Sequence, residues 1–235
     1  MKDLSRAGRI LYAIAMAEFG IQYVLHGFMR GPALGPPFSP ARPFWGYFTA
    51  VVLIIAAVGI ATGKQTRCVA ILLAITLLLR TLVVYAPRIV AHPHDPGPWT
   101  SGFEILAMCC AALVISGLAI GPTRWLFAIS LAVFGTQHFL YAKFVATLVP
   151  SWIPGHLFWA YFVGVAFVAA ALAIAIGKSA RLAATLLGLM FFLWVISLHL
   201  PRVAAAVHNG DEWTSAFVAL AMCGGSWVLA GTVKR

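Results

Sequence analysis

The sequence predicts an all-α polytopic membrane protein, with eight transmembrane helices arranged as two parallel-repeat four-helix bundles and both termini in the cytoplasm. Three observations predict this fold class. Hydrophobic residues make up 62% of the 235 residues and charged residues only 9%, whereas a soluble domain carries about 25% charged residues. The apolar residues form long runs, and the second half of the chain repeats the first. The composition excludes a soluble globular domain, a disordered chain and a disulfide scaffold.

Each apolar run is about as long as the roughly 20 residues that a helix needs to cross a bilayer. The predicted spans are 8–29, 44–62, 68–86, 99–119, 124–144, 156–176, 180–199 and 212–231. These runs do not alternate between apolar and polar residues, as the strands of a membrane β-barrel do. We therefore expect helices, joined by connections that are too short to hold a soluble domain.

The basic residues predict the orientation of these spans. The chain has 16 Lys and Arg against 6 Asp and Glu, a net charge of +10. With the N-terminus in the cytoplasm, ten of the basic residues lie on the cytoplasmic side, five lie on the outer side and one lies within a span. Cytoplasmic loops of membrane proteins carry such an excess. We interpret the charge as this topology signal and expect no nucleic-acid partner. The expected location is a bacterial-type inner membrane, which the chain crosses several times.

The sequence indicates two copies of one four-helix unit, 1–119 and 120–235. Matching residues are 115 positions apart in the first span and 114 apart after a one-residue deletion. Examples are the pairs Gln22 and Gln137, Trp45 and Trp159, Gly63 and Gly177, Pro87 and Pro201, and Trp99 and Trp213. Because each unit has an even number of spans, both copies enter the membrane in the same direction. We expect two similar bundles side by side, with a shared interface or cleft.

Several longer patterns carry a family resemblance. They are FGIQYVLHG and FGTQHFLYAKF in the first spans, LVPSWIPGHLFWAYFVGVAF, GKSARLAATLLGLM, and the last spans that start at Trp99 and Trp213. With these patterns the chain resembles the DoxX-like membrane protein family, over nearly its whole length and twice. The resemblance implies a four-helix bundle for each unit. Some members are similar to the membrane subunit of thiosulfate:quinone oxidoreductase and others are linked to redox-stress complexes, so the resemblance also implies a quinone and a redox partner subunit.

Five polar side chains in the first copy are candidate ligand-binding or proton-relay residues. Glu18, Gln22 and His26 have i, i+4, i+8 spacing, which places them on one face of a helix. Arg80 and Glu104 lie in the outer halves of the third and fourth spans. Since a buried Arg needs a carboxylate partner, we expect Arg80 to pair with Glu104, Glu18 or both. The alternative role of these residues is structural, as hydrogen bonds and an ion pair that hold helices together.

The candidates in the second copy are Gln137, His138 and His199. Haem in a membrane protein often has His as its axial ligand, so His26 and His138 are conceivable haem ligands, but hydrogen-bonded structural histidines are the favoured interpretation. We predict no metal site, because the histidines of the outer loops do not provide the three or four ligands that zinc requires. The four cysteines are interpreted as small buried hydrophobic residues.

We expect the protein to bind a small hydrophobic molecule, with a quinone as the candidate, in an outer-leaflet pocket of the first copy. It would then be the membrane subunit of an electron-transfer system, and a partner subunit would supply the redox centre, because the chain shows no cofactor-binding motif. Two alternatives stay open. One is a small-solute or proton transporter, which parallel repeats can form, and the other is a non-catalytic scaffold or assembly factor. The sequence assigns neither catalytic residues nor an oligomeric state.

Overall fold

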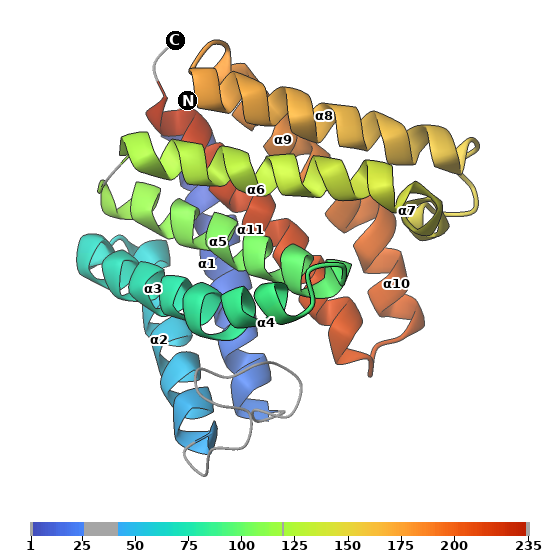
Figure 1. Ribbon diagram of the computed structural model, residues 1–235. Coiled ribbons are helices and arrows are strands. Elements are labelled where there is room, and N and C mark those ends of the chain that lie inside the picture. Colours follow the sequence, from blue (N-terminus) through green and yellow to red (C-terminus); the bar gives the residue numbers. More distant parts are fainter. Residues whose placement is uncertain (1, 26–41, 119, 234–235) are drawn as a thin grey trace.

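The computed structural model describes residues 2–25, 42–118 and 120–233, and the regular elements in these residues are all helices (Figure 1). The α-helices are α1 Lys2–Leu25, α2 Arg42–Thr62, α3 Thr66–Arg80, α4 Ala86–Ala91, α5 Pro96–Ser116, α6 Ile120–Leu140, α7 Ala142–Leu148, α8 His156–Ile176, α9 Ala180–Trp194, α10 Leu200–Ala205 and α11 Gly210–Thr232. Two π-helical segments, η2 Thr81–Tyr85 and η3 Val195–His199, continue α3 and α9. The all-α class is therefore confirmed.

Six helical stretches in the described residues are long and apolar enough to cross a membrane. They are Phe44–Thr62, Thr66–Ala91, Pro96–Ser116, His156–Ile176, Ala180–Ala205 and Gly210–Thr232. Gly121–Leu140 of α6 and Ala142–Leu148 of α7, which are bent by 96° at the break between them, give a seventh candidate if the pair forms one span. Helix α1 is equally long but more charged, and the end of its predicted span, 26–29, lies outside the described residues. Its role as an eighth span stays a prediction.

The two halves of the chain interlock, because the first helix of each half packs along the last helix of the other. Helix α1 packs along α11, α6 packs along α5, and α5 also contacts α11. The α1–α11 contact depends on Gly8 and Gly224: a Cβ on Gly224 would lie 2.6 Å from the backbone oxygen of Gly8 and 2.6 Å from the backbone nitrogen of Tyr12. Small residues permit this close approach between membrane helices. The halves therefore share an interface formed by their first and last helices, and the arrangement as two four-helix bundles stays a prediction.

The turns between α2 and α3 and between α8 and α9 have the same backbone conformation. Gly63 and Gly177 adopt φ values of 75° and 83°, and Gln65 and Ser179, two residues later, adopt 51° and 57°. Positive φ is uncommon for residues with a Cβ, so its occurrence at two positions 114 residues apart is a specific local likeness between the halves.

The π-helical segments η2 and η3 also occupy corresponding positions, and each ends two residues before a proline. Pro87 and Pro201 have no backbone N–H and would clash with the carbonyl group four residues earlier in a regular α-helix. The wider π-helical turn accommodates this disruption. Such segments are frequent at functional sites, and His199 is the last residue of η3.

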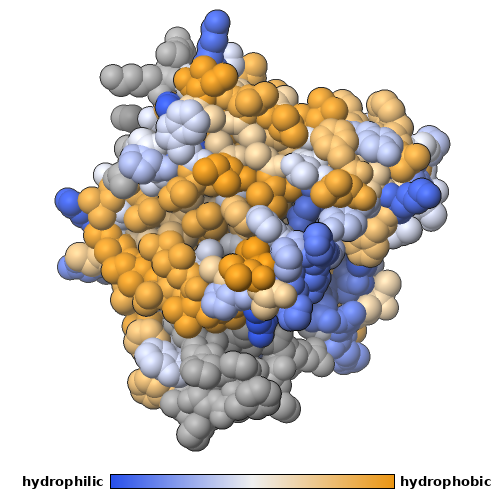
Figure 2. Space-filling model, in the orientation of Figure 1, coloured by the Kyte–Doolittle hydropathy of each residue, from blue (hydrophilic) through white to orange (hydrophobic). Residues whose placement is uncertain are grey.

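Large apolar side chains cover much of the outer surface. Figure 2 shows them across the face formed by α3, α6 and α8, whereas hydrophilic side chains gather where α5 begins and around α10. Val165 and Leu186, for example, are 57% and 54% exposed. Soluble proteins rarely expose an apolar surface of this extent. The surface therefore supports a lipid bilayer as the environment of these helices.

Candidate functional site

A cavity of about 890 Å³ lies between α5, α6, α7, α8, α9 and α11, and its volume is typical of small-molecule sites. Of the described residues in the first half, only α5 and the residue before it contribute to the lining, and the other lining residues belong to the second half. The pocket was expected in the first copy. The corresponding part of that copy includes 26–41, which lies outside the described residues.

Aromatic side chains form one wall of this cavity. Trp194 stacks on the imidazole of His138 with 19° between the ring planes, and Phe167 meets both of these rings edge to face. Phe191 contacts Trp194 with 5.4 Å between ring centres, and Phe134 contacts Phe167 at 5.8 Å. Together these rings, which we call the aromatic wall, offer a large apolar surface against which another ring can stack.

The two histidines that the sequence selected in the second half both line the cavity. His138 Nδ1 lies 2.8 Å from the carbonyl oxygen of Phe134, so this nitrogen donates and Nε2 of the neutral ring is left as an acceptor. The Nδ1 atom of His199 is buried and has no hydrogen-bond partner among the described residues. A buried polar atom without a partner is costly, which makes His199 a candidate contact for a ligand.

Two threonine–glutamine hydrogen bonds join the halves next to the cavity. Thr100 Oγ1 on α5 lies 3.0 Å from Gln137 Oε1 on α6, and Thr214 Oγ1 on α11 lies 2.9 Å from Gln22 Oε1 on α1. Gln137 Nε2 also donates to the carbonyl oxygen of Pro96 at 3.1 Å. Both glutamines therefore connect helices, and Gln137 and the two threonines also line the cavity.

A double-mutant cycle tests the Thr214–Gln22 bond. We expect Thr214→Val and Gln22→Leu to be coupled by about 0.6 kcal/mol in the free energy of unfolding, because interhelical hydrogen bonds in membrane proteins average about that value. The midpoint of unfolding in SDS gives this energy. Thr136 is exposed and bonds only within its own helix, so Thr136→Val combined with Gln22→Leu should show no coupling. Equal coupling in both cycles would contradict the assignment.

Glu104 lines the cavity from α5 and is half-buried. Within the described residues, no hydrogen bond or ion pair joins its carboxyl group to another side chain. Asp95, which precedes α5, and Asp211, in the first turn of α11, are exposed and line the same cavity. Three acidic side chains therefore contribute to one lining.

The comparisons with known proteins agree with the helical architecture. Residues 5–86 match the model of the DoxX family. The first part of the chain therefore resembles the DoxX family. Residues 127–223 match the model of a domain of unknown function, DUF8561, so each half carries its own match. The comparisons with curated proteins and with solved structures gave no match.

In this DoxX-like protein, Glu18 and Gln22 lie on α1 and do not line the cavity. Gln22 Nε2 donates to Glu18 Oε1, and Gln22 Oε1 accepts from Thr214. A short chain of hydrogen bonds thus leads from Glu18 to a residue of the cavity lining. The other carboxyl oxygen of Glu18 is buried without a partner among the described residues. His26, the third residue of the predicted stripe, lies outside the described residues.

Arg80 does not pair with Glu18 or Glu104, and that prediction is wrong. Its guanidinium carbon lies 5.4 Å from the centre of the Tyr23 ring, and its buried Nε has no hydrogen-bond partner in the described part of the chain. A cation above an aromatic ring is attracted by the ring's negative face, which compensates in part for the missing carboxylate. Arg80 ends α3, beside α1, whereas Glu104 belongs to the cavity between α5 and the second half.

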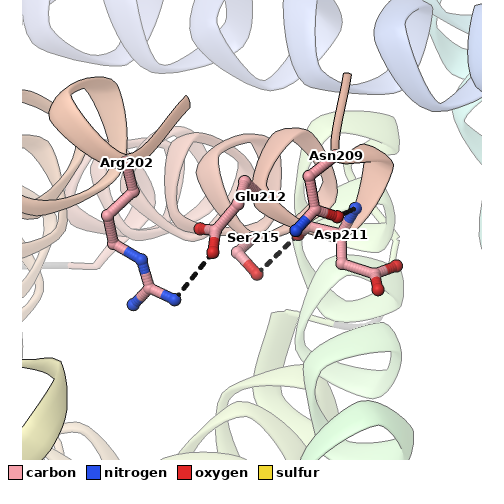
Figure 3. Close-up of polar contacts among 5 residues, drawn as sticks. All are labelled: Arg202, Asn209, Asp211, Glu212 and Ser215. Atoms are coloured by element: carbon pink, nitrogen blue, oxygen red, sulfur yellow. Dashed lines mark hydrogen bonds and ion pairs between the residues drawn. The ribbon is translucent and has the colours of Figure 1, made fainter. Parts of the chain in front are cut away.

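An ion pair that the sequence did not predict stabilises the start of α11. Arg202 Nη2 on α10 lies 2.9 Å from Glu212 Oε1 (Figure 3). Asn209 Oδ1 accepts from the backbone N–H of Asp211 at 3.0 Å, and Ser215 Oγ donates to the backbone oxygen of Asp211 at 2.9 Å. These contacts fix the first turn of α11, from which Asp211 and Ser215 reach the cavity lining.

The aromatic wall and the two aspartates, Asp95 and Asp211, were not among the residues predicted from the sequence. One signal was available: Trp194 occupies the position in the second half that Arg80 occupies in the first, so an aromatic ring replaces a charge there. The described residues contain no group of three or more His, Cys, Asp or Glu placed to hold a metal ion. A bound organic molecule would instead contact the aromatic wall, Glu104 and His199.

Proposed function

We propose that this DoxX-like protein binds a small hydrophobic molecule in the cavity between α5, α6, α7, α8, α9 and α11. The observation that carries the proposal is a cavity of about 890 Å³ with an aromatic wall and a few polar side chains. Ligand pockets of proteins combine a predominantly apolar lining with a few polar groups in this way. A quinone is the candidate that the sequence suggested, and its planar ring matches a wall that favours stacking.

The finer proposal concerns the role of such a molecule. As the membrane subunit of an electron-transfer system, the protein would hold the quinone, and a partner subunit would supply the redox centre. The DoxX match supports a membrane protein of this family, and the aromatic wall supports a ring-containing ligand. These two observations together favour a quinone-binding subunit over a scaffold without a ligand.

Binding of decylubiquinone by the purified protein in nanodiscs tests the proposal. We expect saturable binding in isothermal titration calorimetry, after subtraction of the signal from empty nanodiscs. Trp194→Ala should weaken this binding about fivefold, because an aromatic pair contributes about 1 kcal/mol. Trp45 lies on α2 and does not line the cavity, so Trp45→Ala should bind as the wild type does. Absence of saturable binding of both decylubiquinone and the neutral probe 1-naphthylmethanol would refute the proposal.

Transport is the second candidate function, because three helical stretches are interrupted. Segments η2 and η3 break the regular helices of two spans, and the 96° bend separates α6 from α7. Transporters often form their substrate sites at such discontinuous helices. His199 at the end of η3, together with Tyr141 between α6 and α7, lines the cavity. Uptake of a bound probe into proteoliposomes, beyond that into protein-free vesicles, would favour transport over binding alone.

We also infer that the halves are copies of one unit and that α1 is the eighth span, with both termini in the cytoplasm. The matched turns, the matched π-helical segments and the two threonine–glutamine bonds support the duplication. Exposed Ile14 and Ile21 give α1 an outward apolar surface, which supports its contact with lipid. The described ends of α1 and α11 lie at the same end of the molecule (Figure 1), in agreement with termini on one side of a membrane.

A further inference from the structure

Four of the hydroxyl groups that line the cavity donate their hydrogens to acceptors within the protein. The side-chain oxygens of Thr100, Ser197, Thr214 and Ser215 lie 2.9, 2.7, 2.8 and 2.9 Å from the backbone carbonyl oxygen four residues earlier. For Thr100 and Thr214, a glutamine Oε1 at 3.0 and 2.9 Å is a second acceptor that shares the same hydrogen. A hydroxyl group has one hydrogen to donate but two lone pairs. These four groups can therefore accept a hydrogen bond from a ligand more readily than they can donate one.

One amide, one imidazole and one indole donor of the lining are engaged in the same way. Gln137 Nε2 donates to the carbonyl oxygen of Pro96 at 3.1 Å, and Trp159 Nε1 donates to that of Pro154 at 3.1 Å. The Nδ1–H of His138 is directed to a carbonyl oxygen as well, which leaves Nε2 as an acceptor. These three donors are therefore satisfied by the protein itself.

The acceptors of the lining, in contrast, are in excess and carry negative charge. Asp95, Glu104 and Asp211 line the cavity, and its described lining contains neither Lys nor Arg. Asp95 uses one carboxyl oxygen to accept from the backbone N–H of Gly97 at 2.9 Å. Glu104 accepts from none of the described side chains. Because carboxylates inside a membrane protein are expensive without a partner, the cavity is complementary to a group that donates hydrogen bonds and is positively charged.

The aromatic wall favours the same type of group. Trp194, Phe167 and Phe191 meet at ring-centre distances of 5.4 to 6.0 Å. The faces of aromatic rings attract organic cations, tryptophan most strongly. The lining therefore combines the two features by which proteins recognise organic ammonium groups: free carboxylates and aromatic rings.

We propose that the ligand of this cavity is a lipophilic organic cation, whose ammonium group binds Glu104 and whose apolar part packs against Trp194 and Phe167. The inference rests on the proposed function and names the ligand class of the same cavity. A quinone presents carbonyl oxygens, which only accept hydrogen bonds, so unlike an ammonium ion it offers no donor to the carboxylates of this lining. Asp95 and Asp211, exposed at the first turns of α5 and α11, attract the cation from solution.

Three naphthalene probes of similar shape distinguish the contribution of charge to the binding affinity from that of apolar contact. They are 1-naphthylmethylammonium, neutral 1-naphthylmethanol and anionic 1-naphthoate. We expect the full-length protein in nanodiscs to bind the ammonium probe about tenfold more tightly than the alcohol, since hydrogen bonds to charged groups are worth about 1.5–3 kcal/mol. The naphthoate should bind more weakly than the alcohol. Glu104→Gln should abolish the preference for the ammonium probe over the alcohol, while Glu104→Asp should retain part of the preference.

Asp3→Asn is the matched control, because Asp3 is exposed on α1, does not line the cavity and carries the same charge. It should leave all three affinities unchanged. Equal binding of the ammonium probe and the alcohol by the wild type, or a preference that survives Glu104→Gln, would overturn the inference while the proposed function stands. Tighter binding of decylubiquinone than of the ammonium probe would overturn it as well. Failure of the alcohol and decylubiquinone to bind at all would instead refute the proposed function.

Discussion

We expect Gly224→Val to destabilise the protein by about 3 kcal/mol, because overpacking that displaces backbone costs up to or beyond that amount. Any Cβ at this position would lie 2.6 Å from the backbone oxygen of Gly8 and 2.6 Å from the backbone nitrogen of Tyr12. Backbone atoms cannot move aside as a flexible side chain can. The helices α1 and α11 must therefore separate along their contact, and the midpoint of unfolding in SDS should fall sharply.

Gly121→Ala is the control for this prediction. A Cβ at Gly121 would meet no atom within 4 Å, and its φ is not positive, so the substitution should change the unfolding midpoint little. Gly8→Ala should reproduce the effect of a substitution at Gly224, because its Cβ would lie 2.7 Å from the backbone oxygen of Gly224. If Gly224→Val unfolds at the same SDS fraction as the wild type, the close contact between α1 and α11 is not present in solution.

We expect Val218→Trp to reduce the affinity for 1-naphthylmethylammonium at least about thirtyfold, which corresponds to about 2 kcal/mol. Val218 lies on α11, is half-buried and lines the cavity. An indole at this position would occupy the space that faces the aromatic wall and exclude a ligand of similar size. The affinity can be measured by isothermal titration calorimetry in nanodiscs.

Val58→Trp is the matched control, because Val58 lies on α2, is 58% exposed and does not line the cavity. It adds the same indole to an outward surface and should leave the affinity unchanged. The unfolding midpoint of both variants must be measured as well, so that loss of binding is separated from loss of fold. A folded Val218→Trp protein that binds as the wild type does would place the ligand outside this cavity.

The sequence predicted most helices closely, because hydropathy depends on local composition. The predicted span 156–176 has the bounds of α8, and 44–62 differs from α2 by two residues at its start. The π-helical segments and the bend between α6 and α7 were not predicted. These features depend on how the neighbouring helices accommodate a proline or an interruption of the helix, and a hydropathy pattern does not indicate that.

The sequence identified several residues of the cavity lining, but it did not identify where the cavity lies or which partners these residues have. Glu104, Gln137, His138 and His199 do line one cavity, although the pocket was expected in the first copy. Arg80 was assigned a carboxylate partner by charge, yet it lies above the ring of Tyr23. The sequence shows which side chains are energetically unfavourable inside a membrane. The partners of those side chains depend on how the helices pack against one another.

The sequence by itself determined that the chain is all-helical, suited to a membrane and DoxX-like, because these properties follow from composition and local pattern. Only the tertiary structure decided where a ligand can bind. It packs α5 of the first half against α6 and α11 of the second, and so places Glu104 in the same cavity lining as the aromatic wall. That contact depends on the close approach of interlocked helices, which is set by the fit of small residues across the interface and cannot be inferred from the hydropathy of either helix alone.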